Sequence, residues 1–354
     1  MSRFMSSRYV DLEPYTPGEQ PREQKYIKLN TNENPFPPPP EVQDAVALES
    51  EKLALYSDNE CTELRKVLAK RLGVRPEELV ITNGSDEILY FAFLAFCDEK
   101  TPAVFADITY GFYPVYAGIT RVPARILPLN EDWTLDPTMY RDAGGTIFIA
   151  NPNAPTGLAL PPQQIEWILQ KNPDHVVVVD EAYVDFGARS CARLIRAYEN
   201  LLVIQTFSKS RSMAGGRLGY GIGNEKLIRD LNTIRYSINP YNVNSLTQAA
   251  GIACIEHDEY NFVNCSEIIE NREWTRAELL KLGFRVTESR ANFLFASHPA
   301  FPGDQLYARL KERGILIRHF GIERIRDWNR ISIGYRWQME RMIETIRAML
   351  EETV

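Results

Sequence analysis

Short apolar runs alternate with amphipathic stretches of helix length along the first two thirds of the chain. The stretches between the runs are bounded by proline or glycine, as in residues 161–170. The run Val176 to Val179 shows no polar alternation, as expected for a strand that is buried on both faces. Together the runs predict an α/β domain in which a mostly parallel sheet lies between two layers of helices. These runs are residues 79–82, 102–107, 146–150, 176–180 and 201–207.

The pattern changes at about residue 244, where longer helical stretches and short alternating strands begin. We expect a smaller α+β domain there. Near the other end, Pro35 and the four prolines at 37–40 are too stiff for a helix interior or a central strand, so they indicate a joint. We therefore expect an N-terminal arm and joint that packs with the small domain, followed by a large domain and a small domain. Their predicted ranges are 1–40, 41–243 and 244–354.

Composition and charge exclude several classes of protein. The chain has 354 residues and a net charge of −7, and 44% of its residues are hydrophobic. This length and this hydrophobic content are enough to build two apolar cores. Lysine and arginine are spread along the sequence, so we expect no nucleic-acid partner. There is no secretory signal pattern and no apolar run of about 18 residues, so we expect a cytoplasmic protein without membrane contact. Five scattered cysteines without a CxxC pair, and four scattered histidines, predict neither disulfides nor a metal site.

Polar residues follow four of the predicted strands. Ligands of open α/β sheets bind at the carboxyl ends of the strands, so these polar residues are candidates for a ligand site. Taken one at a time, these residues are better explained as a helix cap, turns and a surface lysine. Together they supply an amine, a carboxylate, a phenol and a phosphate cradle. They lie at 83–86, 151–157, 180–183 and 208–209.

The segment from Thr206 to Tyr220, which reads TFSKSRSMAGGRLGY, resembles the lysine region of fold type I pyridoxal-phosphate aminotransferases. The gap of eight residues between Lys209 and Arg217 is that of the family. The likeness extends from residues 29–35 to residues 330–334, nearly the whole chain, and is closest to the histidinol-phosphate aminotransferase branch. It implies an aspartate-aminotransferase-like fold and pyridoxal 5′-phosphate as the cofactor.

The resemblance assigns roles around the cofactor ring. Lys209 would bind the aldehyde covalently and then carry the substrate proton, which suits a desolvated lysine with a lowered pKa. Asp180 would keep the pyridine nitrogen protonated, and Tyr183 would hydrogen-bond the phenolic oxygen of the ring. Tyr110 would stack on the ring, although the sequence is equally consistent with a core aromatic residue.

The phosphate of the cofactor would be bound at the start of the helix that follows residue 84. Ser85 and Asp86 would offer backbone N–H groups, and Ser208 and Arg217 would add side-chain donors. Because Asp86 is acidic, we expect its side chain to turn away. Tyr56 resembles the tyrosine that reaches the phosphate of the neighbouring subunit, which implies a homodimer with a shared active site.

One position departs from the family pattern. An asparagine usually stands immediately before Pro-Thr-Gly and hydrogen-bonds the ring oxygen, but here that residue is Ala154. Either Asn153 supplies the amide, or Tyr183 holds the oxygen alone.

Substrate recognition would depend on two arginines. Arg330 resembles the arginine that grips the anionic group of the substrate, and Arg318 lies on a neighbouring strand-like segment. A carboxylate needs one guanidinium, whereas a phosphate monoester with a charge of about −2 rewards two. If the two arginines converge on one pocket, a phosphorylated amine is the favoured substrate. If they do not, Arg318 is a surface charge. Tyr15 and Asn32, on the arm, would close over the substrate.

By resemblance we expect a transaminase of histidine biosynthesis that uses L-histidinol phosphate as amine donor and 2-oxoglutarate as acceptor. The alternatives are an aromatic or broad-specificity amino-acid aminotransferase, a phosphothreonine-type decarboxylase, and a non-catalytic cofactor-binding module. The intact Lys209 and the absence of a basic patch count against the last of these.

Overall fold

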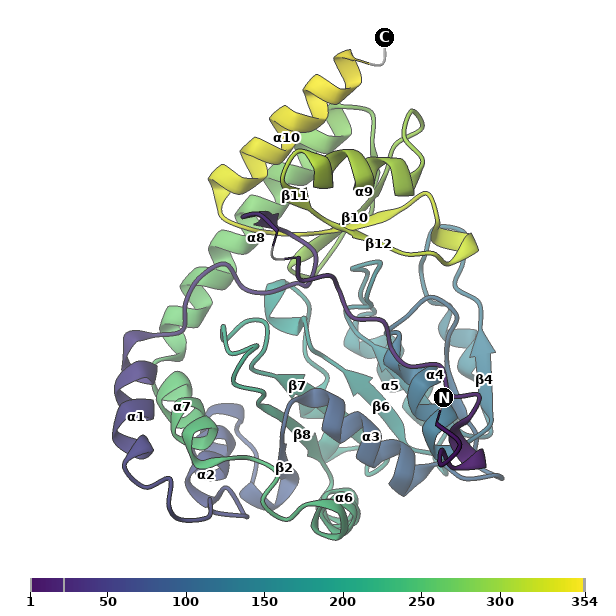
Figure 1. Ribbon diagram of the computed structural model, residues 1–354. Helices are drawn as coiled ribbons and strands as arrows, with labels where there is room; N and C mark the ends of the chain where they lie inside the picture. Colours follow the sequence, from purple (N-terminus) through teal and green to yellow (C-terminus); the bar gives the residue numbers. More distant parts are fainter. Residues whose placement is uncertain (1, 22, 353–354) are drawn as a thin grey trace.

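In the computed structural model, which describes residues 2–21 and 23–352, a seven-stranded sheet forms the centre of the larger part of the molecule (Figure 1). The strand order is β2-β8-β7-β6-β5-β3-β4; β8 runs antiparallel to its two neighbours and the other pairs are parallel. The strands are β2 (Leu79–Thr82), β3 (Ala103–Ala106), β4 (Ala124–Leu127), β5 (Thr146–Ala150), β6 (Val177–Asp180), β7 (Leu201–Thr206) and β8 (Gly219–Gly223).

Helices cover both faces of this sheet because its strands are apolar on both sides. Val177 and Val179 of β6 belong to one buried cluster, while Val178 belongs to the cluster on the opposite face. The predicted three-layer α/β/α domain is therefore confirmed. Its helices are α1 (Pro40–Ser50), α2 (Thr62–Leu72), α3 (Ser85–Phe96), α4 (Phe112–Thr120), α5 (Pro162–Lys171), α6 (Glu225–Ile238) and α7 (Ser245–Glu256).

A second, smaller sheet has the antiparallel order β12-β13-β10-β9. Leu294 and Ile331 from this sheet are fully buried against Met339 and Ile343 of the last helix. The elements are β9 (Arg285–Val286), β10 (Phe293–Ser297), β12 (Arg318–His319), β13 (Asn329–Ser332), α8 (Asp258–Lys281), α9 (Gly303–Glu312) and α10 (Arg336–Glu351). Short 3-10 helices span Ser7–Tyr9, Pro76–Glu78, Pro137–Tyr140, Val184–Phe186, Ala192–Arg196 and Glu323–Ile325.

The N-terminal arm contributes a strand to the smaller part. Residues of β1 (Ile27–Lys28) pair in parallel with β11 (Ile315–Leu316). At the other predicted boundary, α7 packs on α1 and α2, and its side chains Ala253 and Cys254 join the larger core. The long helix α8 then extends toward the smaller sheet (Figure 1). The boundary at 243/244 stays a prediction, and these contacts favour a position after α7.

Two further features concern membranes and cysteine chemistry. Among the described residues, no helix has both the length and the apolar character needed to cross a membrane. The described chain also holds no group of three or more histidine, cysteine or acidic side chains placed to bind a metal ion. All five cysteines are free thiols; Cys97 is half-buried and the other four are buried.

Candidate active site

A cavity of about 220 Å³ lies where the carboxyl ends of the central strands face the smaller sheet and the N-terminal arm. Twelve of the fourteen residues predicted from the sequence line it, so the fold brings together segments that are far apart in the chain. Asn153 and Tyr56 do not line it. The twelve are Tyr15, Asn32, Ser85, Asp86, Tyr110, Asp180, Tyr183, Ser208, Lys209, Arg217, Arg318 and Arg330.

Lys209 stands on the loop that follows β7. Its Nζ donates a hydrogen bond to the backbone oxygen of Thr31 at 3.3 Å and lies 5.8 Å from the centre of the Tyr183 ring. Desolvation by the surrounding protein, together with the positive charge of Arg330, lowers the pKa of this amine to about 8. A substantial fraction of the amine is therefore neutral near pH 7–8, as a nucleophile or a proton carrier requires.

Asp180 is the last residue of β6 and is 5% exposed. Its carboxylate accepts hydrogen bonds from the Ala182 backbone N–H at 3.2 Å and from the Tyr113 hydroxyl at 3.4 Å. Burial nevertheless raises the pKa of Asp180 to about 7. A cationic N–H group placed beside this carboxyl would favour its ionised form and would be held protonated in return.

Two glycines shape an anion cradle at the start of α3. Gly84 has φ +81°, and a Cβ there would lie 2.6 Å from Nη2 of Arg217. At Gly219 a Cβ would lie 2.5 Å from the backbone nitrogen of Ser85. Only glycine thus lets the arginine and β8 come this close to the helix. Since Gly84 has no side chain to cap the helix, the N–H groups of the first turn point at any anion bound there.

The side chain of Asp86 does not turn away, so that prediction is wrong. Its Oδ2 pairs with Nη2 of Arg217 at 3.0 Å, and its Oδ1 accepts a hydrogen bond from the Tyr110 hydroxyl at 2.7 Å. The attraction of these two donors holds the carboxylate inside the cradle, and an acidic residue also suits the first turn of a helix. A phosphate bound in the cradle would compete with this carboxylate for Arg217.

Asn32 of the arm holds Tyr183. The backbone of Asn32 is left-handed, with φ 56°, and its amide nitrogen donates to the Tyr183 hydroxyl at 3.0 Å. Its amide oxygen accepts a hydrogen bond from the Ser332 hydroxyl at 2.8 Å. The structure therefore gives Asn32 a direct role in orienting Tyr183, in addition to its place in the cavity wall.

Arg318 and Arg330 converge. They are directly opposite each other in the antiparallel pair β12–β13, so both side chains project from the same face of the sheet. Arg318 donates to the backbone oxygens of Thr16, at 2.8 Å, and Pro17, at 3.1 Å. Arg330 donates to the backbone oxygen of Asn30 at 3.0 Å, while its buried Nε has no hydrogen-bond partner among the described residues. Like charges in this position repel each other, so a bound anion would stabilise the pair.

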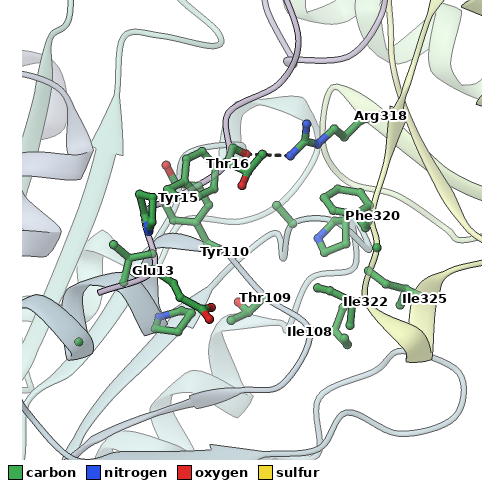
Figure 2. A pocket seen from close by; sticks show the side chains of 18 of the residues that line it. Glu13, Tyr15, Thr16, Ile108, Thr109, Tyr110, Arg318, Phe320, Ile322 and Ile325 are labelled. Atoms are coloured by element: carbon green, nitrogen blue, oxygen red, sulfur yellow. Dashed lines mark hydrogen bonds between the residues drawn. The ribbon is translucent and has the colours of Figure 1, made fainter. Parts of the chain in front are cut away.

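A larger cavity of about 890 Å³ is lined by the arm, by α4 and by the segment that follows β12, and it shares both arginines with the first cavity (Figure 2). The ring of Tyr15 stacks on Phe112 at 4.2 Å and lies 6.3 Å from the Tyr110 ring. Figure 2 shows the Arg318 side chain reaching back to Thr16 of the arm. The arm therefore forms one wall of the route to Lys209. The shared lining of the two cavities includes Tyr15, Tyr110, Ala154, Arg318, Phe320 and Arg330.

The amide of Asn153 is used by its own loop and by the loop that follows β3. It donates to the Ile108 backbone oxygen at 2.9 Å and to the Thr156 hydroxyl at 3.1 Å, and it accepts from the Thr109 hydroxyl at 2.8 Å. The expectation that Asn153 replaces the usual amide therefore has no support in the geometry. Tyr56 is 83% exposed and stacks on Tyr241 with ring centres 4.6 Å apart.

Two contributors escaped the sequence reasoning. Tyr113, which donates to Asp180, lies three residues after Tyr110, and this helical spacing was the available signal. The second contributor is the backbone oxygen of Thr31, which accepts the hydrogen bond of Lys209. Every residue has a backbone oxygen, so the sequence gives no sign of this role.

A strand-end lysine, a buried aspartate and an anion cradle define a cofactor-dependent enzyme of the α/β class. The chain belongs to the aminotransferase class I and II family, whose family model matches residues 24–346. It is 46% identical to the histidinol-phosphate aminotransferase of Marinomonas sp. (strain MWYL1) and 44% identical to that of Brachyspira hyodysenteriae. Each alignment covers 99% of this chain and 100% of the relative. The family expected from the sequence is confirmed.

Solved structures show the same fold. The histidinol-phosphate aminotransferase from Sinorhizobium meliloti, solved in complex with pyridoxal 5′-phosphate, superposes with a TM-score of 0.84 at 24% identity over 92% of each chain. An aspartate aminotransferase from Thermus thermophilus superposes with a TM-score of 0.83 at 20% identity over 98% of this chain and 99% of that chain. The predicted aspartate-aminotransferase-like fold is therefore confirmed.

Proposed function

We propose that this protein is a pyridoxal-phosphate-dependent aminotransferase of histidine biosynthesis that takes its amino group from L-histidinol phosphate and passes it to 2-oxoglutarate. The observation that supports this substrate is the juxtaposition of Arg318 and Arg330 across β12–β13, in the cavity that Lys209 also lines. Full-length relatives named histidinol-phosphate aminotransferase support the same conclusion.

The residues present fit the cofactor. Lys209 would hold the aldehyde carbon, Asp180 the pyridine nitrogen and Tyr183 the phenolic oxygen, while Arg217 and Ser208 would bind the phosphate together with the first turn of α3. The glycine-lined cradle and its uncapped N–H groups are the features that a phosphate dianion requires. When bound, the cofactor withdraws the electron pair that is left as the substrate Cα–H bond breaks.

Two atoms of the chain would carry or hold protons in this reaction, namely Nζ of Lys209 and the hydroxyl oxygen of Tyr183. Nζ of Lys209, with a pKa of about 8, can take a proton from the substrate carbon and return one near neutral pH. The Tyr183 hydroxyl is fixed by the Asn32 amide at 3.0 Å, so its remaining hydrogen-bonding capacity faces the cavity. Tyr15 of the arm lines both cavities, so the arm lies beside the route by which a substrate reaches the amine.

The arginine pair suits a phosphate monoester. Each Nη nitrogen of Arg318 carries a second N–H beyond the one that it donates to the arm. Arg330 adds the unpartnered N–H of its Nε. Two guanidinium groups can therefore share the three terminal oxygens of a phosphate, whereas a carboxylate would leave one of them without an anion.

The test is a half-reaction without acceptor. Purified protein loaded with pyridoxal phosphate is mixed with L-histidinol phosphate, and the visible absorption of the bound cofactor is recorded. L-Histidinol, which lacks only the phosphate, phenylalanine and aspartate are compared in parallel. We expect half-conversion at a concentration about 100-fold lower for histidinol phosphate than for histidinol, since several charge-assisted hydrogen bonds separate them. Equal conversion by phenylalanine would transfer the assignment to a broad-specificity aminotransferase, and no conversion by any amine would refute the proposal.

We also propose that two copies of the chain form the active unit. Leu53, Leu55 and Tyr56 are 57%, 72% and 83% exposed, and Tyr56 stacks on the half-exposed Tyr241, so the two segments make one apolar surface. Surfaces of this kind are typical of protein interfaces. A second copy seated there would let Tyr56 reach the phosphate cradle of its partner.

The dimer is tested by substituting Leu55→Lys and measuring mass by light scattering. We expect monomers and weakened cofactor binding. Ile126→Lys, at a similarly exposed apolar residue of β4, is the matched control and should leave the mass unchanged. Dimers of unchanged stability in Leu55→Lys would contradict this interface.

A further inference from the structure

Arg211 lies two residues after Lys209 on the same loop, and its side chain is almost completely buried. The guanidinium contacts two carboxylates from different segments. Its Nε lies 3.1 Å from Oδ1 of Asp258 and its Nη2 donates to Oδ2 of the same residue at 3.3 Å. On the other side, Nη1 donates to Oδ2 of Asp185 at 3.4 Å. A single buried cation thus joins three parts of the chain.

The two carboxylates belong to elements that matter for the cavity. Asp258 is the first residue of α8, the helix that leads into the smaller core, and it also pairs with Nε of Arg71 at 2.8 Å. Asp185 lies in the 3-10 helix at 184–186, directly after Tyr183, and accepts a hydrogen bond from the Ser210 hydroxyl at 2.5 Å. The cluster therefore ties the lysine loop to the Tyr183 segment and to α8.

Three further contacts to residues 209–211 come from neutral groups and reach backbone oxygens. The backbone oxygen of Lys209 accepts a hydrogen bond from the Asn34 amide at 2.9 Å. The thiol of Cys265 donates to the backbone oxygen of Ser210 at 3.9 Å, and that of Cys254 to the backbone oxygen of Arg211 at 3.8 Å. The ion cluster adds charged restraints on the side chains of residues 210 and 211, and charge-assisted bonds in a buried place are the stronger ones.

We infer that Arg211 is a positioning residue for the reaction, which fixes Nζ of Lys209 relative to Tyr183 and the rest of the cavity. It does not line the cavity, so it acts through Lys209. The inference rests on the proposed function, because it takes Lys209 as the reacting amine. Lysine could not replace Arg211, since only a planar fork reaches carboxylates on two sides at once.

Loosening the loop would change the environment of the amine. Its pKa is low mainly because the surrounding protein excludes water from Nζ. Water that enters a displaced loop would return this pKa toward its ordinary value of 10.5. The charged groups that face Nζ from the neighbouring elements are Arg330, Arg217, Asp86, Glu33 and Asp180, and the ring of the titratable Tyr183 lies 5.8 Å from it.

The experiment measures capture of pyridoxal phosphate by the cofactor-free protein across a pH series. Capture joins Nζ to the aldehyde carbon as a C=N bond and releases water, and only the neutral amine reacts. Borohydride stops the reaction, and peptide mass spectrometry measures labelling at Lys209. For Arg211→Lys we expect capture at pH 7 to be slowed about tenfold for each unit by which the pKa rises, with convergence on the wild-type rate above pH 10.

Two further variants make the result decisive. Asp185→Asn removes one arm of the cluster while Arg211 keeps Asp258, so we expect a smaller slowing in the same direction. Arg65→Lys is the matched control, because Arg65 is an arginine of α2 that bonds the Pro76 backbone oxygen outside the cavity. Its pH profile should be that of the wild type.

A wild-type pH profile in folded Arg211→Lys and Asp185→Asn proteins, checked by circular dichroism, would overturn the inference. If Arg211→Lys does not fold, Asp185→Asn alone decides. Failure of the proposed function gives a different result, since the wild-type chain would then fail to capture the cofactor at Lys209 or to convert histidinol phosphate.

Discussion

The two ends of the cavity carry positive charge in different ways. At the large-domain end, Arg217 is paired with the Asp86 carboxylate at 3.0 Å. At the small-domain end, Arg318 and Arg330 face each other across two strands, and they donate hydrogen bonds to neutral backbone oxygens of the arm and of Asn30. Charge is therefore balanced inside the protein at one end and left for a ligand at the other.

This difference explains why an anion should prefer the small-domain end. A phosphate that enters the cradle must displace a carboxylate, whereas one that binds the arginine pair relieves a repulsion. Burial already lowers the pKa of Arg330, and the charge of Arg318 lowers it further. Both effects oppose the charged form, and a bound dianion would reverse them.

The largest effect should follow from removing the amine of Lys209, on which the proposed reaction depends. Lys209→Ala removes the amine that is placed to carry the substrate proton, so turnover should fall on the order of 10⁴-fold or more. Turnover with histidinol phosphate is the measurement, and phosphate binding at the arginine pair should persist as the control. Retained turnover would break the assignment of the whole cavity.

The next effect concerns the two arginines at the small-domain end, Arg318 and Arg330. Arg330→Gln should lower kcat/KM for histidinol phosphate about 100-fold, because it removes two or more charge-assisted hydrogen bonds. Arg318→Gln, whose side chain also holds the arm, should lower it about tenfold or more. Neither change should alter kcat/KM for L-histidinol as strongly. An equal loss for both amines would show that the pair does not read the phosphate.

A binding measurement on the cofactor-free protein tests the comparison directly. Inorganic phosphate should raise the melting temperature by a few degrees, since saturation at 100 times Kd stabilises by about 2.7 kcal/mol. Arg330→Gln should remove most of this rise, whereas Arg217→Gln should leave most of it. The opposite ranking would show that the cradle, despite Asp86, is the stronger anion site.

The smallest effect concerns Asp180. Its folded-state pKa of about 7 exceeds the ordinary value of 3.8, so the folded protein holds a proton that the unfolded chain has released across this window. Stability therefore falls as pH rises from about 4 to 7 and stays lowered above pH 7. In the cofactor-free protein, Asp180→Asn should melt a few degrees above wild type at pH 8.5, with a smaller difference at pH 5.5. Calorimetry at both pH values measures this, and a difference independent of pH would contradict the raised pKa.

Much of the larger domain could be predicted from the sequence. The apolar runs at 79–82, 146–150 and 201–207 match strands β2, β5 and β7, because strands buried on both faces leave a clear hydrophobic signature. Lys209, Asp180 and Arg217 could be placed near one another because the carboxyl ends of parallel strands share an edge. The family resemblance then supplied their roles, which stay proposals.

The remaining features depend on pairing and on side-chain competition. The register that sets Arg318 opposite Arg330 belongs to two strands of two and four residues, too short to show a periodic pattern. The expectation that the Asp86 side chain turns away considers only its negative charge. It leaves out the hydrogen bonds that Arg217 and Tyr110 donate to this carboxylate. The amide of Asn153 could not be assigned because its partners, such as the Ile108 backbone oxygen, come from a distant loop.

The pairing of β1 with β11 determines when the cavity can be completed during synthesis. Ser332 donates its backbone N–H to the oxygen of Leu29, and its hydroxyl bonds Asn32, across some 300 residues of sequence. A ribosome releases residues 27–34 long before residues 315–332 exist, so the early segment has no partner during most of synthesis. The cavity is therefore completed late, and a nascent chain halted before residue 315 would carry Lys209 without the arm docked against β11, a state that pulse-labelled translation followed by protease treatment could detect.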